Sequence, residues 1–197
     1  MRAKLLAMAD PARKRATYDD VLAVPGTLVA EVVDGVLHTS LRPALRHARA
    51  TTSLISELGG PFDRGRGGPG GWHILIEPEL HLGSDILVPD LAGWRRDRLA
   101  TIPDVAFLTL APDWLCETLS PSTAGFDRGD KLVVYAREHV PYVWFVDPIA
   151  RTLEVLALDG PSYRVHAVHH GAAVVRAAPF DAVELELAGL WLSADPT

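Results

Sequence analysis

The chain has 197 residues, of which 48% are hydrophobic and 22% charged, and this composition is that of one globular domain with a sizeable core, which excludes disordered and fibrous proteins. A single cysteine excludes an internal disulfide and cysteine-rich zinc sites, so a reducing, cytoplasmic location is expected. The net charge of −6 argues against a large, unspecific nucleic-acid-binding surface, and no apolar stretch approaches the roughly 20 residues that a membrane helix needs.

Three clusters of basic residues are nevertheless present. Each is most simply a solvated face, although each could also contact an anionic partner. The clusters are Arg13, Lys14 and Arg15; Arg42, Arg46 and Arg49; and Arg95, Arg96 and Arg98.

The N-terminal residues 1–16 are basic and are expected to form a mobile arm ahead of a single domain over residues 17–197. Thr17, with Asp20 three residues later, has the spacing of a capping box and predicts the start of a short helix. Pro25 and the glycine after it end that helix.

Residues 28–40 contain two short apolar runs on either side of Asp34-Gly35. This dipeptide between apolar runs is typical of a tight β-hairpin. Glu31 would lie on the first strand of that hairpin.

Apolar residues at three-to-four spacing predict a helix over residues 43–58, which Gly59-Gly60 would stop. The glycine-rich residues 64–71 predict a surface loop. They lack the Lys-Ser or Lys-Thr ending of a phosphate-binding loop, so they fit a nucleotide-binding loop of that type poorly.

From residue 72 onward, the sequence predicts a series of strands and one helix. Residues 72–83 and 84–94 predict two strands, the second almost continuously apolar and therefore central and covered on both faces. Further along, the sequence predicts a strand at 112–120, a helix at 127–139, a strand at 142–147 and a final hairpin that turns at Asp159-Gly160. The predicted fold is α/β, with a mixed sheet flanked by helices, an N-terminal hairpin and a C-terminal hairpin.

Three residues on these elements are candidates for catalysis. Asp90 follows a proline at a strand, Glu117 lies among apolar neighbours on the next strand, and Lys131 shares one helix side with Asp127 and Tyr135 at intervals of four. A carboxylate among apolar residues is costly unless it is paired, protonated or metal-bound. From these residues alone, a purely structural arrangement is favoured, with a Glu117–Lys131 ion pair and Asp90 capping a turn; a hydrolytic cation site is the alternative.

The order of the elements resembles the PD-(D/E)xK nuclease superfamily and, within it, the Uma-type family of putative restriction endonucleases. The resemblance covers about residues 17–192. It rests on TYDDVLAVPG, VAEVVDG, Arg46-His47, VPD, CETLSPST, DRGDKLVVYA and YVWFVDP.

The resemblance implies a restriction-endonuclease-like fold and a set of site residues. Asp90, Glu117 and the backbone carbonyl of Thr118 would hold the metal, and Lys131 would be the catalytic lysine. Leu119 departs from the commoner pattern, which has lysine there, so Lys131 would act from the following helix. Glu31 and His47 match further family positions and would be accessory, with Glu77 and Glu79 as weaker candidates.

The function implied is Mg²⁺-dependent hydrolysis of DNA phosphodiester bonds, with Mn²⁺ as a substitute metal and a homodimer by analogy with restriction enzymes. A catalytically inactive binding or regulatory module with the same fold is the main alternative. A glycosidase with a carboxylate pair ranks lower. Ser120, Ser122 and Thr123 lack a nucleophile elbow, which argues against a serine hydrolase, and His169 and His170 lack the spacing of metal ligands.

Overall fold

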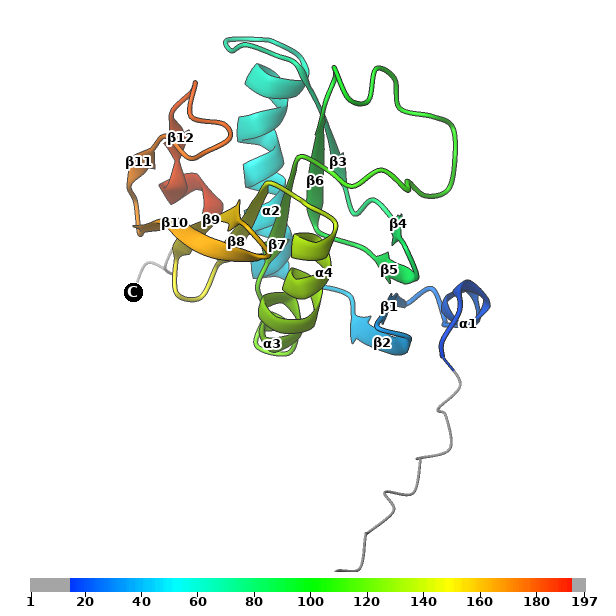
Figure 1. The fold of residues 1–197 in the computed structure, drawn as a ribbon. Helices are drawn as coiled ribbons and strands as arrows, with labels where there is room; N and C mark the ends of the chain where they lie inside the picture. Colours follow the sequence, from blue (N-terminus) through cyan, green and yellow to red (C-terminus); the bar gives the residue numbers. More distant parts are fainter. Residues whose placement is uncertain (1–14, 193–197) are drawn as a thin grey trace, which may run out of the picture.

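The larger of two main β-sheets forms the centre of the computed structural model, which describes residues 15–192 (Figure 1). Its six strands are arranged in the order β10-β9-β8-β7-β6-β3. Strands β7 and β8 are parallel and all other neighbours are antiparallel, so the sheet is mixed, as predicted. The strands are β3 (Trp72–Ile76), β6 (Leu91–Arg95), β7 (Trp114–Thr118), β8 (Tyr142–Asp147), β9 (Thr152–Asp159) and β10 (Ser162–His170).

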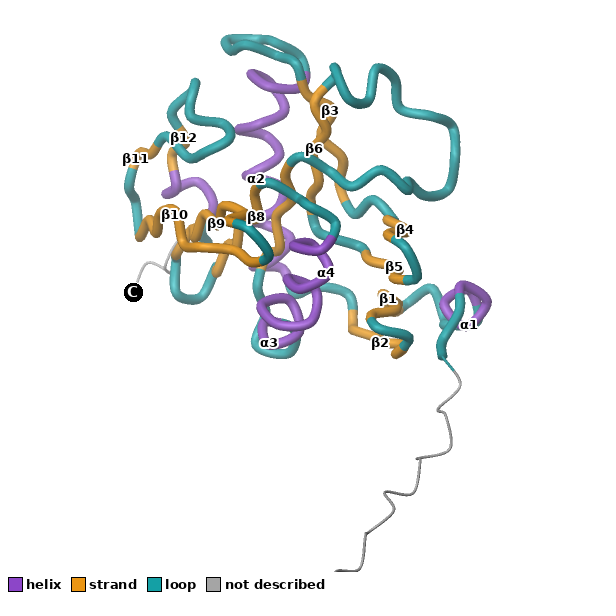
Figure 2. Tube along the Cα trace, in the orientation of Figure 1, coloured by secondary structure: helices purple, strands orange, loops and turns teal. Residues whose placement is uncertain are grey.

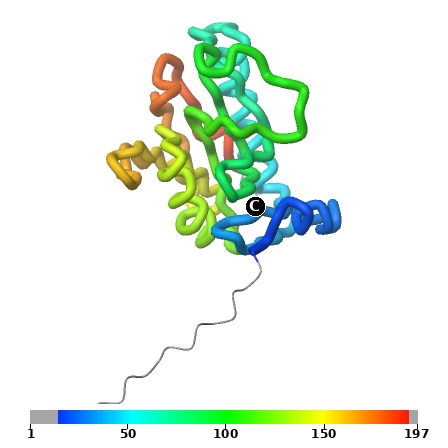
Figure 3. Tube along the Cα trace, turned by 45° about the vertical axis from the view of Figure 1, so that its right-hand side comes forward, coloured from blue at the N-terminus to red at the C-terminus, as the bar shows by residue number. Residues whose placement is uncertain are grey.

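The smaller sheet contains the N-terminal hairpin. Its strands, in the order β2-β1-β5-β4, are β1 (Leu28–Val33), β2 (Val36–Leu41), β4 (Leu80–Leu82) and β5 (Asp85–Leu87). The turn between β1 and β2 has positive φ at both Asp34 (49°) and Gly35 (76°), which is the geometry that two-residue hairpin loops require. The predicted hairpin is therefore confirmed. Figures 1 and 3 both place this hairpin at the lower end of the molecule, beside α3 (Ala124–Phe126).

The helices begin and end close to the predicted residues. In α1 (Tyr18–Leu22), the carboxylate of Asp20 accepts hydrogen bonds from the backbone N–H of Thr17 at 2.8 Å and from its hydroxyl at 2.9 Å. The long helix α2 spans Leu45–Leu58, and its continuation Gly59–Asp63 is a π-helical turn. Gly59-Gly60 therefore ends the α-helix but does not stop the helical path. The remaining helices and turns are the π-helical turn Asp127–Lys131, α4 (Leu132–Arg137) and the 3₁₀ turn Leu187–Leu190 (Figure 2).

Both faces of the larger sheet are covered, because alternate residues of its strands enter two separate cores. Trp114 and Cys116 of β7 pack with α2 and with the C-terminal segment around Phe180. Leu115 lies between them in sequence and packs with Val134 of α4 on the opposite face. The C-terminal segment also contains a two-stranded sheet formed by β11 (Val174–Val175) and β12 (Leu185–Glu186).

The prediction of two uninterrupted strands over 72–83 and 84–94 was wrong. The chain leaves the larger sheet after Ile76, forms the β4–β5 hairpin in the smaller sheet and returns at Leu91. Pro78 and Pro89 stand at the two crossings, where a residue without an N–H donor cannot continue a ladder. One excursion thus joins the two sheets and places Asp90 at the return point.

The predicted N-terminal arm lies outside the described residues except for its last two positions. There, the N–H of Ala16 donates to the carbonyl of Gly35 at 2.8 Å, and Arg15 forms an ion pair with Asp34 at 3.2 Å. These contacts attach the chain to the hairpin turn. Among residues 15–192, no helix is long and apolar enough to cross a membrane.

Candidate active site

The two predicted acidic residues lie side by side where β6 begins and β7 ends. The antiparallel ladder reaches Leu91 opposite Cys116, so Asp90 lies just before β6 and Glu117 just beyond that last pair. The sequence had indicated a strand position for Asp90, but Asp90 lies just outside the strand. Because β6 and β7 are interior strands, the site lies at the strand ends in the middle of the sheet.

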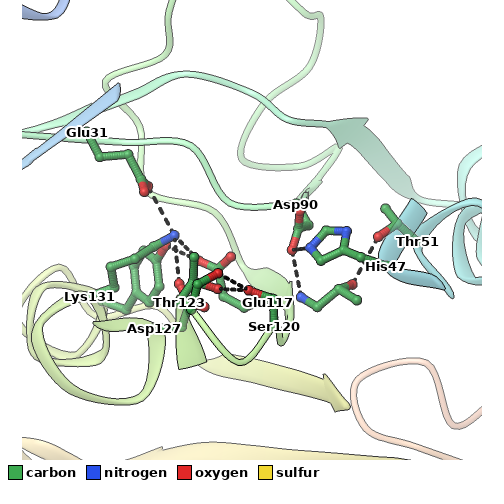
Figure 4. Close-up of polar contacts among 12 residues, drawn as sticks. Glu31, His47, Thr51, Asp90, Glu117, Ser120, Thr123, Asp127 and Lys131 are labelled. Atoms are coloured by element: carbon green, nitrogen blue, oxygen red, sulfur yellow. Dashed lines mark hydrogen bonds and ion pairs between the residues drawn. The ribbon is translucent and has the colours of Figure 1, made fainter. Parts of the chain in front are cut away.

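A backbone hydrogen bond fixes the Asp90 side chain across this gap. The N–H of Thr118 donates to Oδ2 of Asp90 at 2.6 Å, so the carboxylate takes the place of a ladder carbonyl. The same oxygen lies 3.2 Å from Nε2 of His47 in α2. The predicted accessory histidine is therefore buried beside Asp90, and Figure 4 shows its ring directed at that carboxylate.

Strand alternation separates the two sides of the site. Thr118 faces α2, where its hydroxyl lies 3.0 Å from the hydroxyl of Thr51. Glu117 faces α4, where the Tyr135 hydroxyl donates to its Oε1 at 2.6 Å. Glu117 and Asp90 thus reach the end of the sheet from neighbouring strands, each held by a different helix.

Lys131 is enclosed by three carboxylates. Its Nζ lies 2.8 Å from Glu117, 3.0 Å from Glu31 and 3.4 Å from Asp127, and Figure 4 shows these side chains converging on it. All four side chains are buried. The structure therefore joins Glu117 and Lys131 in the predicted ion pair and adds Glu31 from the smaller sheet.

Hydrogen bonds to the smaller sheet fix the position of Glu31. Its Oε1 also accepts the N–H of Val88 at 2.9 Å, in the segment that leads back to Asp90. A second link lies nearby, where buried Asp85 accepts the N–H of Asp34 at 2.6 Å and pairs with Arg137 of α4 at 2.8 Å. The hairpin that carries Glu31 is thereby tied to the helix that follows Lys131.

Burial and neighbouring charges shift the protonation of this cluster. Burial raises the pKa of Glu117 well above its usual range, with Lys131 opposing the shift and Asp127, Asp90 and Glu31 adding to it. Burial also raises the pKa of Asp127, and Lys131 again opposes. Burial alone would lower the pKa of Lys131, but the surrounding carboxylates, Glu117 first, hold it well above the usual value. Lys131 is therefore an ammonium at neutral pH.

A pocket of about 280 Å³ opens over these side chains. Its lining contains all the predicted catalytic and accessory residues, including Thr118, together with Asp127. Of the weaker candidates, Glu77 lines the pocket mouth as an exposed side chain, whereas Glu79 hydrogen-bonds His81 at 2.7 Å. Ser120 and Thr123 also line the pocket, and their hydroxyls lie 2.9 Å apart.

The residues present suit a hard divalent cation in charge and ligand chemistry. Four carboxylates line the pocket: those of Glu31, Glu117 and Asp127 are buried around the Lys131 ammonium, and that of Asp90 is partly buried. An excess of negative charge is therefore held in a poorly solvated place. No group of three or more His, Cys, Asp and Glu side chains within residues 15–192 is arranged as a ready metal site. Mg²⁺ is usually bound through one or two carboxylates, with waters and substrate phosphate as its other ligands.

Three residues around the site, Asp127, Tyr135 and Thr51, had no role assigned from the sequence. Asp127 and Tyr135 were expected on the same helix side as Lys131, and their spacing of four was the available signal. Thr51, which contacts Thr118, carried no sequence signal at all.

The basic clusters are largely paired with protein groups. Arg96 contacts Asp63 at 3.0 Å, Arg98 contacts Asp113 at 2.7 Å and Arg95 lies over the Trp72 ring. Arg42 donates to a backbone carbonyl at 3.2 Å. Arg42 also lines the active-site pocket, while Arg13 and Lys14 lie outside the described residues.

Comparisons with known proteins place the chain in a family. Residues 17–188 match the model of the Uma2 family, described as "Putative restriction endonuclease". Among solved structures, the chain is similar to a putative nuclease belonging to DUF820 from Anabaena variabilis ATCC 29413, at 20% identity and a TM-score of 0.71, over 89% of this chain and 97% of that one. No curated protein matches it. The restriction-endonuclease-like fold and the family resemblance are thus confirmed, and the chain belongs to the Uma2 family of putative restriction endonucleases.

Proposed function

We propose that this protein is a Mg²⁺-dependent endonuclease that hydrolyses phosphodiester bonds of DNA, with Asp90, Glu117 and Lys131 as its catalytic residues. The observation that carries the proposal is the placement of a buried ammonium and two carboxylates from adjacent strand ends in one pocket. The family supports nuclease chemistry, and carboxylates beside an ammonium suit a phosphate ester and a hard cation.

Asp90, Glu117 and the backbone carbonyl of Thr118 would hold the cation. When bound, Mg²⁺ supplies Lewis-acid stabilisation and lowers the pKa of water. In hydrolysis the water oxygen forms a new bond to phosphorus, one P–O ester bond breaks, and the leaving oxygen takes a proton. The side chains must therefore orient water, stabilise negative charge and keep their own positions.

Lys131 acts as a fixed positive charge. Its raised pKa keeps it protonated at neutral pH, so it does not accept the proton of the attacking water. Its ammonium instead stabilises the negative charge that develops on the phosphate oxygens. Glu31 and Asp127 hold Nζ in place at 3.0 Å and 3.4 Å, and His47 orients Asp90 from 3.2 Å.

A plasmid-nicking assay tests this proposal. The wild-type protein should cut DNA with Mg²⁺ or Mn²⁺ and not with EDTA, and Asp90→Asn, Glu117→Gln and Lys131→Met should each abolish cutting. Asparagine at 90 keeps an oxygen for the Thr118 N–H, and glutamine at 117 keeps one for Tyr135, so folding is preserved. Asp130→Asn is the matched control, because Asp130 is exposed one residue before Lys131.

Metal binding distinguishes the proposal from a catalytically inactive module. A cation that binds only the folded protein raises the free energy of unfolding by mass action. Millimolar Mg²⁺ or Mn²⁺ should therefore stabilise the wild-type protein and the Asp130→Asn control, but not the Asp90→Asn variant. Absence of both metal stabilisation and cutting would favour the inactive module.

A further inference from the structure

A second cavity opens beside the candidate active site. We name it the side pocket; it has a volume of about 340 Å³ and is lined by His38, Thr39, Ser40, Ser122, Thr123 and Phe126, among others. It shares five residues with the active-site pocket, so the two cavities adjoin: Glu31, Ser40, Leu41, Ser122 and Thr123. Nothing in the proposed hydrolysis uses this second space.

Two stacked rings form one wall of the side pocket. The rings of His38 and Phe126 have centroids 4.2 Å apart and an interplanar angle of 22°. Each ring is only partly buried. The pair joins the β1–β2 hairpin to α3, and both rings line the side pocket.

This aromatic wall is attached directly to the catalytic cluster. His38 pairs with Glu31 across the hairpin, so the two side chains lie on one face of the sheet about 5 Å apart at Cβ. Phe126 immediately precedes Asp127, and Nζ of Lys131 lies 5.8 Å from its ring centroid. A group bound against these rings would therefore adjoin the phosphate that Lys131 contacts.

The remaining lining of the side pocket is rich in hydroxyl groups. Thr39, Ser40, Ser122 and Thr123 supply hydrogen-bond donors and acceptors around the rings. The volume lies within the range of about 300–1,000 Å³ that is typical of small-molecule pockets. Aromatic rings with nearby hydroxyl groups are suited to a nucleobase, which is recognised by stacking on its face and by hydrogen bonds at its edge. A base inside a paired duplex exposes no free face, so only an unpaired base could enter.

We propose that the side pocket binds an unpaired nucleobase next to the scissile phosphate, so that this protein cuts DNA at single-stranded or flipped-out nucleotides. The inference rests on the proposed function and specifies its substrate. Stacking on the wall places one nucleotide, and Lys131 and the carboxylates then act on its phosphate.

Oligonucleotide binding tests the pocket without cleavage. Anisotropy in EDTA would compare a labelled single strand with a strand of equal length whose nucleotides all lack bases, which leaves the phosphate contacts unchanged. The wild-type protein should bind the strand with bases about tenfold more tightly, as expected from stacking of one base. His38→Ala and Phe126→Leu should each remove this preference, while His38→Phe, which keeps a ring, should retain it. His166→Ala is the matched control, since His166 is an exposed residue of β10, an edge strand of the larger sheet, and does not line either pocket.

Cleavage then separates this inference from the proposed function. With Mg²⁺, the wild-type protein should cut single strands, or duplexes with an unpaired nucleotide, at least about tenfold faster than a fully paired duplex, and His38→Ala should abolish that ratio. Equal rates on paired and unpaired DNA would overturn the inference and leave the proposed function standing. Equal affinity for strands with and without bases would also overturn it. A protein that cuts no DNA but keeps the ring-dependent preference would contradict the proposed function and retain the base pocket.

Discussion

The ammonium of Lys131 lies 2.8 Å from a carboxylate oxygen of Glu117, and the side chain of each is 3% exposed. A buried pair of this kind gives little net stability, because desolvation offsets the attraction, but removal of one partner leaves the other charge unpaired. The pair therefore makes stability and the proposed catalysis depend on the same two residues.

Removal of the Lys131 charge should strongly destabilise the fold. Lys131→Met keeps much of the side-chain volume and leaves Glu117, Glu31 and Asp127 without their shared cation. The free energy of unfolding should fall by about 3–5 kcal/mol, measured in urea by the fluorescence of the buried tryptophans. Asp130→Asn should stay within about 0.5 kcal/mol of the wild type. A loss no larger than that of the control would show that the carboxylates need no cation.

The pH dependence of stability should reveal the protonation of Glu117. Its pKa is raised on folding, so the folded protein binds that proton more tightly than the unfolded chain does. The resulting stabilisation is present below the unfolded pKa and is lost as the pH rises through the folded pKa. In the presence of EDTA, Glu117→Gln should therefore gain stability relative to the wild type as the pH rises from acidic to neutral. Parallel pH profiles from urea titrations would contradict the raised pKa.

The Tyr135 hydroxyl should contribute chiefly by holding Glu117. Tyr135→Phe removes a hydrogen bond of 2.6 Å to a buried carboxylate and changes little else in the core. A loss of about 1–3 kcal/mol in unfolding free energy is expected from a bond of this kind, measured in urea. The nicking rate should fall less than in Glu117→Gln, since the carboxylate itself remains. A nicking rate as low as that of Glu117→Gln would instead give Tyr135 a direct catalytic role.

His47 should act on metal affinity through Asp90. His47→Ala removes the group 3.2 Å from Oδ2 of Asp90, while the Thr118 N–H still holds that oxygen. The Mg²⁺ concentration for half-maximal nicking should rise by about 10–100-fold, with a much smaller effect at saturating Mg²⁺. His166→Ala should leave the Mg²⁺ dependence unchanged. A reduced rate at all Mg²⁺ concentrations would show that His47 acts on the substrate.

Local sequence signals were sufficient to predict the elements that have distinctive turn or capping residues at their ends. Asp34-Gly35 fixed the first hairpin because few residues adopt positive φ at two consecutive positions, and Thr17 with Asp20 fixed the start of α1. The smaller sheet was missed because apolar runs show strand character but not strand partners. Pro78 and Pro89, at which the two long runs break, were the signals that could have revealed it.

The main residues of the site could be predicted from sequence motifs, but most of their contacts could not. Asp90, Glu117 and Lys131 belong to separate elements. The residues alone indicated the Glu117–Lys131 ion pair, and the family order indicated that Asp90 lies in the same site. The role of Glu31 as a partner of Lys131 depends on a hairpin that docks from another sheet, a long-range contact with no local signature. Asp127 and Tyr135 were on the expected helix side, and Asp127 contacts Lys131 one turn away. The partner of Tyr135, Glu117, depends on which residues of β7 face α4.

The most direct test of the central claim is anomalous diffraction from crystals of the protein soaked in Mn²⁺. We predict an anomalous peak bound by the carboxylates of Asp90 and Glu117 in the wild type, and its loss in Asp90→Asn. A wild-type crystal that shows nicking activity after dissolution, but has its Mn²⁺ peak elsewhere and none at these two carboxylates, would contradict the assignment.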